Sequence, residues 1–268
     1  MTIQPWENPV LAALKQKRPV VAATITSSSV DAAAHLATMG FDFLWIETEH
    51  SPVTLETLRH MVLATRGAKA VPFARVPVNE LWTAKRVLDA GVYGVIFPFT
   101  STPELAAQAA AACKYPPHGR RGSGAGLAKF AWPEVDDYYN AADQNVAVIV
   151  IIEEARAVEN VDAIAATPGV DVMFIGTSDL SFSLGLRGRQ NEPDLHAAIQ
   201  KVLDAGKRHN KPVGRPAGSP EQIKQFIEQG FLLFQAPTDL GFMTAGARRY
   251  LEPLEKARAQ KEEPRALY

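Results

Sequence analysis

The chain has 268 residues, a length that suits one α/β barrel or two smaller domains. An apolar fraction of 47% and a charged fraction of 21% are ordinary for a globular protein, so a sizeable core can be buried. The net charge of −1 and the pI of about 6.6 give no electrostatic reason to expect nucleic acid or an anionic membrane as partner.

Strand-like and helix-like segments alternate along the whole chain. The strand-like runs are nearly continuous in apolar or β-branched residues, as strands buried on both faces require. We expect strands over 19–26, 41–48, 70–76, 91–99, 146–153, 170–177, 211–217 and 231–237. We expect helices over 31–39, 54–66, 80–90, 103–113, 155–166, 194–209, 219–229 and 239–257. Eight strands, each followed by a helix, predict a single (β/α)8 TIM-barrel domain over 1–268.

A doubly wound open sheet is the main alternative fold. It would carry a Gly-rich first turn, whereas the first strand here runs into the Ser-rich segment 25–31. Residues 2–17 predict an extra helix before the first strand, with Pro5 and Pro9 near its start. The one long irregular stretch, 115–145, has a length at which functional loops are common.

Cysteine content and the amino-terminal sequence indicate a cellular location. Cys113 is the one cysteine, so neither an internal disulfide nor a thiolate cluster for zinc can form. The first 19 residues lack a basic-then-apolar signal pattern, and no run approaches about 18 apolar residues. We therefore expect a cytoplasmic protein that does not bind membranes.

Polar side chains stand where four of the expected strands end. His50 closes the second run, Arg75 the third, Glu153 the fifth, and Asp179 follows the sixth. In parallel α/β folds the carboxyl ends of the strands are where catalytic groups assemble. A base, a cation and two isolated carboxylates at such ends are typical of an active site.

Glu153 and Asp179 lie one βα unit apart, so they are expected on adjacent strand ends. Two carboxylates there can bind a hard divalent cation, with water and substrate as further ligands. Structural roles remain open, since Glu153 can pair with an arginine and Asp179 can cap the turn at 180–185. Glu154 cannot point inward together with Glu153, because successive strand residues face opposite sides.

His50 has the side chain of a general base near neutral pH, and Arg75 that of a bidentate carboxylate ligand. Their structural alternatives are an ordinary loop hydrogen bond and an ion pair inside the barrel. Asp89, at the end of the helix over 80–90, is by itself a surface charge.

No expected strand ends in lysine, so Schiff-base chemistry is not expected. The Gly-rich segment 119–126 lacks a G-K-[ST] ending, so a nucleotide is not expected either.

Several motifs, in order and spacing, resemble the HpcH/HpaI aldolase family of metal-dependent class II pyruvate aldolases. The resemblance covers about 20–255. The motifs are GFDFLWIETEHSP, ARV, LDAGVYGVIFP, YPPHGRRG, IIEE and VDVMFIGTSDLSFSLG. It implies a divalent metal (Mg, Mn or Co) and cleavage of a 4-hydroxy-2-oxo acid to pyruvate and an aldehyde.

The resemblance also implies a role for each matching residue. His50 would be the base, Arg75 the ligand of the 2-oxo acid, and Asp89 the acid that raises the basicity of the histidine, through the packed barrel or a subunit contact. The expected metal ligands are Glu153 and Asp179. The expected substrate-binding positions, besides Arg75, are Ile151, Gly176, Thr177, Ser178 and Asp179.

Two positions depart from the family pattern. Family members commonly carry Asp in place of Glu47, and many carry Gln in place of Ile151, so a contact near His50 and the oxo-acid preference can differ here.

Two alternative functions stay open. One is a CoA-ester lyase of the citrate or malyl type, for which Arg120 and Arg121 offer the one basic stretch. The other is a catalytically silent, regulatory oxo-acid-binding barrel.

The expected aldehyde pocket lies among the loops 27–30, 215–218 and 236–242, with Arg215, Phe242 and Met243 as candidates. The segment after the last strand is long and carries many apolar side chains. Such surface usually marks a subunit contact. The family resemblance implies an extended, exchanged carboxyl-terminal helix and a homo-oligomer, most simply a hexamer.

Overall fold

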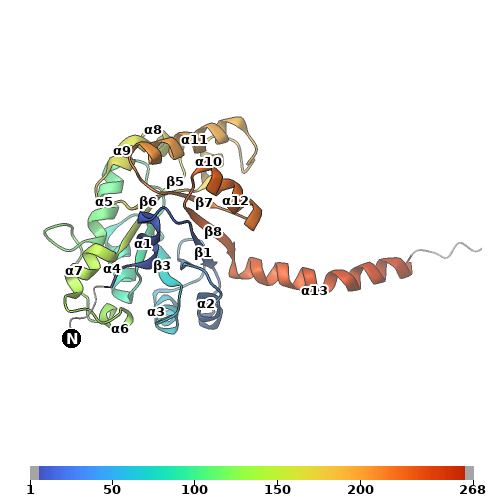
Figure 1. Cartoon of the computed structure of the whole chain (residues 1–268), viewed down its shortest axis with the longest axis horizontal. Coiled ribbons are helices and arrows are strands. Elements are labelled where there is room, and N and C mark those ends of the chain that lie inside the picture. The colour runs from blue at the N-terminus through green and yellow to red at the C-terminus, as the bar shows by residue number, and fades with distance from the viewer. Residues whose placement is uncertain (1–5, 263–268) are drawn as a thin grey trace, which may run out of the picture.

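Eight parallel strands close into a barrel in the order of the chain (Figure 1). The computed structural model describes residues 6–262, and for 255–262 the backbone alone. The strands are β1 Val20–Ile25, β2 Phe43–Glu47, β3 Val71–Arg75, β4 Gly94–Phe97, β5 Ala147–Ile152, β6 Val172–Ile175, β7 Val213–Pro216 and β8 Leu233–Thr238. The predicted barrel is confirmed and the open sheet is wrong, because β1 pairs with both β2 and β8.

The predicted helices between the strands are also present. They are α2 Val30–Ala37, α3 Leu55–Ala64, α4 Leu81–Ala90, α5 Pro103–Cys113, α8 Ala155–Glu159, α9 Val161–Ala166, α11 Pro193–Arg208, α12 Pro220–Gln229 and α13 Asp239–Glu262. Thr54, Thr102 and Ser219 cap their helices by accepting a backbone N–H, as Ser/Thr at these positions predicts. The expected single helix over 155–166 is instead two helices that meet at Asn160.

The amino-terminal helix is shorter than expected. It is α1 Pro9–Lys15, because Pro9 takes the first helical position and the Asn8 side chain accepts the N–H of Val10. Asn8 also donates to the backbone oxygens of Tyr93 and Asn145, which ties the start of the helix to the barrel. Residues 2–5 of the expected helix lie outside the described residues.

Three short helices lie where the sequence indicates irregular structure or a turn. The stretch 115–145 contains α6 Ala128–Ala131 and α7 Tyr138–Asn145, so it is only partly a loop. The segment after β6 forms α10 Thr177–Ser183 rather than a simple turn. Each is too short for a clear helical period, so the apolar pattern does not reveal it.

Alternation along the strands fills the barrel and decides which polar groups face its interior. Phe43, Trp45 and Glu47 occupy alternate positions of β2 and therefore share one face. The Phe43 ring lies 4.7 Å from that of Phe73 on β3, and the Trp45 ring lies 4.8 Å from that of Phe174 on β6. Since β2 and β6 stand on opposite sides of the barrel, this face is the interior, and Glu47 closes the aromatic stack at its carboxyl end.

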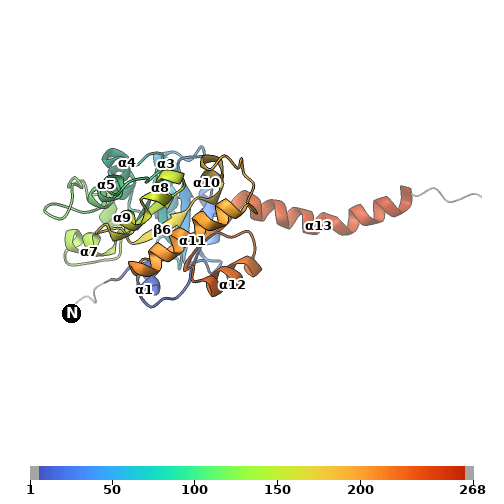
Figure 2. The same ribbon diagram turned by 90° about the horizontal axis from the view of Figure 1, so that it is seen from above.

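Helix α13 leaves the barrel and runs away from it in both views (Figures 1 and 2). Phe242, in its first turns, lies against Phe41 with ring centroids 5.9 Å apart. Farther along, the apolar side chains are open to solvent, with Tyr250 80% and Leu254 51% exposed. The helix therefore does not cover the wall of its own barrel. Within the described residues, no helix is long and apolar enough to cross a membrane.

Candidate active site

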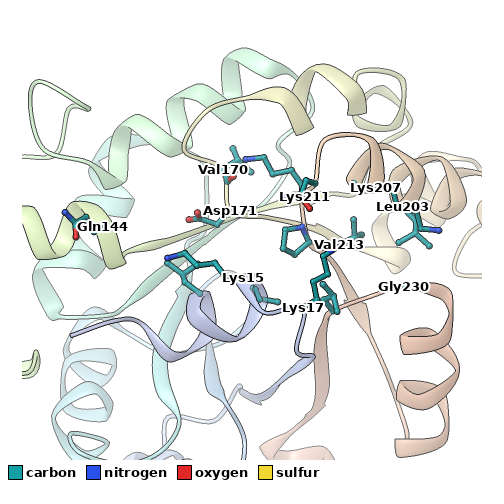
Figure 3. Close-up of a pocket in the computed structure, with 16 residues that line it drawn as sticks. Lys15, Lys17, Gln144, Val170, Asp171, Leu203, Lys207, Lys211, Val213 and Gly230 are labelled. Carbon is teal, nitrogen blue, oxygen red and sulfur yellow. Dashed lines mark hydrogen bonds between the residues drawn. The ribbon is translucent and has the colours of Figure 1, made fainter. Parts of the chain in front are cut away.

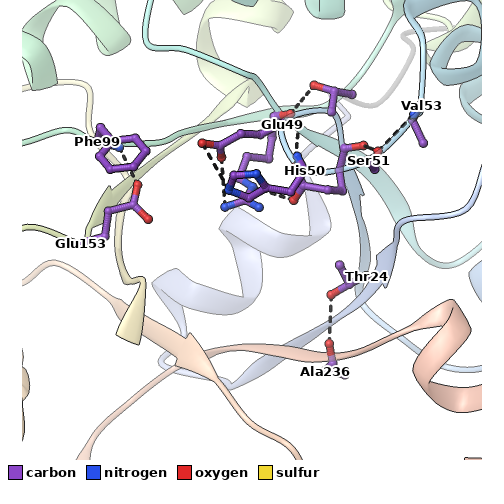
Figure 4. A network of polar contacts seen from close by, with 11 residues as sticks. Thr24, Glu49, His50, Ser51, Val53, Phe99, Glu153 and Ala236 are labelled. Atoms are coloured by element: carbon purple, nitrogen blue, oxygen red, sulfur yellow. Dashed lines mark hydrogen bonds and ion pairs between the residues drawn. The ribbon is translucent and has the colours of Figure 1, made fainter. Parts of the chain in front are cut away.

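The carboxyl ends of β2, β3 and β5 bring together His50, Arg75 and Glu153, three of the predicted residues. Figure 4 shows His50 beside Glu49, and Glu153 beside Phe99. Glu47 and Arg75 are register partners on neighbouring strands, so their side chains leave the sheet side by side. Arg75 donates from Nε to Glu47 at 2.6 Å and lies 3.1 Å from Glu49 through Nη1. The predicted ion pair of Arg75 inside the barrel is therefore present. These two contacts use two of five N–H groups, so donors remain for a substrate.

Glu47 also shapes the loop that carries His50. Its Oε1 accepts the backbone N–H of Glu49 at 2.7 Å and of His50 at 3.1 Å. Ser51 closes the same turn by donating its hydroxyl to the Glu47 carbonyl at 2.5 Å. The longer side chain of Glu, where the family commonly has Asp, thus keeps a supporting contact to the His50 loop through the backbone.

His50 is the most open of these side chains, with 64% of its surface exposed. Its Nε2 lies 3.7 Å from Oε1 of Glu49. The open ring can reach a substrate above the barrel, and the nearby carboxylate can stabilise a positive charge on the imidazole.

Glu49 is a member of this cluster that sequence reasoning did not single out. Burial raises the pKa of Glu49, while the positive charges of Arg75 and His50 act against that rise. The motif E-x-E-H was visible in the sequence, but only the fold shows that Glu49 stands between Arg75 and His50.

Glu153 is buried just past the end of β5, with 2% of its surface exposed. Among the described residues, its hydrogen bond comes from the backbone N–H of Phe99, which donates to Oε1 at 2.6 Å. Burial raises the pKa of Glu153 to about 7; the Phe99 N–H opposes this, and the negative charges of Asp179 and Glu49 add to it. Phe99 makes this contact from a φ of 47°, an uncommon conformation for an aromatic residue.

The predicted substrate-binding positions border Glu153. A Cβ atom on Gly176 would lie 2.6 Å from Oε2 of Glu153 and 3.1 Å from Cγ2 of Ile151, so only glycine fits between them. Thr177, Ser178 and Asp179 form the first turn of α10, where backbone N–H groups have no partner within the helix. Ile151 presents a hydrocarbon surface in this corner.

The donor set fits a divalent cation held partly by water and substrate. Glu153 is a buried carboxylate with one hydrogen-bond donor, and the charge of Asp179 is close enough to raise its pKa. A hard cation would neutralise both. Within the described part of the chain, no cluster of three or more His, Cys, Asp or Glu side chains has the geometry of a complete metal site. Glu154 turns away and accepts the hydroxyl of Ser101.

Asp89 does not join this cluster within one chain. It lies at the end of α4, which leads to the amino end of β4, whereas His50 follows the carboxyl end of β2. Among the described residues its one ion pair is with Arg121, at 3.7 Å. The two side chains therefore make no direct contact within the described chain, and the predicted support of His50 by Asp89 stays a prediction.

The expected aldehyde loops lie close together, but two of the named candidates point elsewhere. Asp239 accepts the N–H and hydroxyl groups of Thr26 and Ser27, which joins the loops after β1 and β8. Arg215 places its guanidinium 3.7 Å from the ring centroid of Phe226 on α12, in the helix layer. Phe242 lies against Phe41, as described above, and not over the barrel mouth.

A separate cavity of about 650 Å³ lies at the opposite, amino end of the barrel (Figure 3). Lys15, Lys17, Lys207 and Lys211 line it together with Asp171. Catalytic groups of α/β barrels stand at the carboxyl end, so this cavity is not the candidate active site.

Comparisons with known proteins find one family. The model of the family described as HpcH/HpaI aldolase/citrate lyase matches residues 25–245. A 5-keto-4-deoxy-D-glucarate aldolase of Salmonella arizonae is 38% identical over 82% of this chain and 86% of its own. A protein of the same name from Shigella boydii is 34% identical over 94% of this chain and 98% of its own. The crystal structure of an HpcH/HpaI aldolase/citrate lyase family protein from Burkholderia cenocepacia is 34% identical, with a TM-score of 0.86 over 92% of this chain and 99% of its own.

The raised pKa of Glu153 predicts how stability depends on pH in metal-free protein. With a pKa of about 7 in the folded chain against 4.5 in the unfolded one, the folded state binds more protons between these values, so stability falls as pH rises through this window. Glu153→Gln removes that loss. The free energy of unfolding of Glu153→Gln minus that of the wild type should rise by about 3 kcal/mol from pH 4 to pH 8. Urea denaturation in the presence of chelator measures both values.

Glu154→Gln is the matched control, because Glu154 lies next in sequence but bonds to Ser101. It should follow the wild-type pH dependence at the same protein concentration. If the free energy of unfolding of Glu153→Gln fell with pH as steeply as that of the wild type, Glu153 would not be a buried carboxylate with a raised pKa.

Proposed function

The chain belongs to the HpcH/HpaI aldolase/citrate lyase family and is a carbon–carbon lyase, and we propose that it cleaves 4-hydroxy-2-oxo acids reversibly to pyruvate and an aldehyde. The observation that carries this proposal is the group His50, Arg75, Glu153 and Asp179 at the carboxyl end of a barrel that matches aldolases over most of its length. The reaction uses no Schiff-base lysine and no nucleotide.

Glu153 and Asp179 would hold the divalent cation, with Mg, Mn and Co as the candidates. A bound cation supplies a Lewis acid for the 2-oxo acid. Glu153 is preorganised for this role because the N–H of Phe99 fixes Oε1 while Gly176 leaves Oε2 uncovered.

Arg75 would bind the oxo acid with its remaining N–H groups and stabilise the negative charge that develops when the bond between C3 and C4 breaks. Glu47 and Glu49 hold the guanidinium from one side, which orients the rest of it. The backbone N–H groups of Thr177 and Ser178 would donate hydrogen bonds to the substrate carboxylate.

His50 would move the proton. In the cleavage direction it takes the proton of the 4-hydroxyl, the C3–C4 electron pair passes to the pyruvate half as an enolate, and the aldehyde leaves. Protonation at C3 then gives pyruvate. Glu49, 3.7 Å from the ring, stabilises the imidazolium that forms in between.

The named relatives indicate the substrate class. They act on 5-keto-4-deoxy-D-glucarate, a hydroxylated dicarboxylate, and we infer that this chain acts on a sugar-derived acid of that kind. Ile151 cannot donate a hydrogen bond to the oxo acid, so the affinity for pyruvate should depend mainly on Arg75, the metal and the N–H groups of α10.

The CoA-ester lyase alternative receives less support. Of the two arginines offered for CoA phosphates, Arg121 is 1% exposed and packs against Tyr115 and Tyr138. That leaves Arg120 as the exposed cation of the pair.

We also propose a homo-oligomer, most simply a hexamer, with α13 exchanged between subunits. Helix α13 exposes Leu240, Met243, Tyr250, Leu251 and Leu254 and covers little of its own barrel. Helix α12 has no fully buried residue, so this part of the helix layer also remains open to contact with another subunit. Apolar surface of this extent marks a subunit contact.

A chelator test separates an aldolase from a silent oxo-acid-binding barrel. Pyruvate release should require added Mg, Mn or Co, and both Glu153→Ala and Asp179→Ala should lose metal-dependent turnover while the barrel stays folded by circular dichroism. Glu154→Ala is the control and should keep turnover, because its carboxylate bonds to Ser101. Full activity of both carboxylate variants after chelator treatment would refute the class II mechanism.

His50→Ala should slow cleavage by about 10²–10⁴-fold, the usual contribution of a positioned acid–base group. His60→Ala, on the exposed face of α3, should leave the rate unchanged. Steady-state pyruvate release measures both. A rate within threefold of the wild type for His50→Ala would remove the histidine from the chemistry.

Assembly is tested on the exposed half of α13. Leu251→Glu combined with Leu254→Glu changes side chains that are 45% and 51% exposed, so the fold of one chain should not suffer. Light scattering should show the wild type well above the 29.1 kDa of one chain and the variant at a lower mass with reduced activity. A fully active wild type near 29.1 kDa would contradict the oligomer.

A further inference from the structure

The cavity at the amino end of the barrel gathers positive charge that the protein does not balance (Figure 3). Its volume of about 650 Å³ lies within the range of cavities that bind small molecules. In the described part of the chain its lining holds four lysines, Lys15, Lys17, Lys207 and Lys211, and one carboxylate, that of Asp171. The ends of α1 and α11 thus bring four cations to face one anion.

Two of the four lysines are explained by the local structure. Lys15 pairs with Glu7 at 2.9 Å, and Lys207 lies 3.9 Å from Asp204. Both lysines also stand in the last turn of a helix, where a cation interacts favourably with the carbonyl groups of the helix end. Lys15 and Lys207 therefore need no ligand to account for their positions.

Lys17 and Lys211 have no such explanation. Among the described residues, neither lies within ion-pair distance of a carboxylate. Lys211 is half-buried, and its Nζ donates to the carbonyl oxygen of Val170, which carries no charge. Burial lowers the pKa of Lys211, and the charge of Asp171 acts against that fall without cancelling it. A bound anion would stabilise this ammonium group further.

Asp171 is a poor counter-ion for these lysines. Its Oδ2 accepts the backbone N–H of Val148 at 2.8 Å, which directs the carboxylate toward β5. Burial raises the pKa of Asp171, although the charges of Lys114, Lys211 and Lys15 oppose the rise. The cavity therefore keeps an excess of positive charge.

The walls between the lysines are apolar. Leu14 on α1, Leu203 on α11 and Val213 on β7 are buried residues that line the cavity. An inorganic anion would use the charges alone, and a neutral hydrocarbon would use the walls alone. A ligand that has both an apolar part and several negative charges matches the whole surface.

We propose that this cavity binds a small organic anion, with at least two negative charges on carboxylate or phosphate groups beside an apolar part. The site is separate from the candidate active site, because it lies at the amino end of the barrel and His50, Arg75 and Glu153 lie at the carboxyl end. A ligand there touches α1 on one side and α11 with β7 on the other, so it holds the amino-terminal helix against the barrel.

Isothermal titration calorimetry of the full-length, metal-loaded protein at pH 8 tests the site with isophthalate and phenyl phosphate. Each probe joins a benzene ring to two negative charges, so the pair distinguishes a carboxylate from a phosphate ligand. At least one should bind about tenfold or more tightly than sulfate or benzyl alcohol at equal ionic strength, because sulfate lacks the ring and benzyl alcohol lacks the charge. Arg75→Gln should bind that probe as the wild type does, because the candidate active site is not the place of binding.

Lys17→Asn combined with Lys211→Gln removes the two charges that lack a carboxylate partner. Asn tolerates the φ of 55° at position 17, and Gln keeps an N–H donor for the Val170 carbonyl. The affinity for the probe should fall by about tenfold or more, as the loss of two charge-assisted contacts implies. Lys201→Gln, on the exposed face of α11 and outside the cavity, is the matched control and should bind as the wild type does.

If the double variant does not fold, Lys17→Asn alone takes its place, with an expected loss of about threefold or more. Hydrogen exchange of the wild type locates the probe, which should protect backbone amides in 10–17 and 203–213 and leave the His50 loop unchanged. The proposal is overturned if neither probe binds, if sulfate binds as tightly, if the lysine variant keeps the wild-type affinity, or if protection is confined to the His50 loop. Metal-dependent pyruvate release is measured apart from this binding, so the proposed function fails or holds independently.

Discussion

One buried carboxylate, that of Glu47, organises the mouth of the barrel. It accepts the Nε–H of Arg75 at 2.6 Å and the backbone N–H groups of Glu49 and His50, so it ties β2, β3 and the histidine loop to one point. Register makes this possible, because Glu47 and Arg75 pair across the two strands. A neutral side chain at this position would weaken the contact to the adjoining loop and the ion pair with the guanidinium of Arg75 together.

The rest of the mouth carries more negative charge than the protein itself can neutralise. Glu47, Glu49, Glu153 and Asp179 face one guanidinium, and burial holds the pKa of Glu49 and of Glu153 above its ordinary range. Without a bound cation, repulsion within such a cluster lowers the free energy of unfolding. In the proposed mechanism the same repulsion would favour a divalent ion, because a bound cation would relieve it.

The sequence predicted the barrel because its strands are long apolar runs with single polar residues at their ends. Alternation along β2 and β5 is enough to place Glu153 inside and Glu154 outside. The role of Glu49 and the φ of Phe99 depend on contacts between distant strands, which no local pattern carries. The sequence did not predict the short helices α6, α7 and α10 for a related reason. Tertiary contacts and caps hold them, and they have too few residues to show a helical period of apolar side chains.

Asp89 shows that a residue predicted to support the site can lie far from it in one chain. The sequence alone left open a path through the packed barrel or a subunit contact, and the fold sets Asp89 and His50 at opposite ends of the barrel. A subunit contact would need a second copy, which the proposed homo-oligomer would supply. Helix α13 runs away from its own barrel (Figure 2), and its side chains Tyr250, Leu251 and Leu254 are exposed. In the proposed oligomer, a neighbouring chain would cover these apolar side chains and remove them from water.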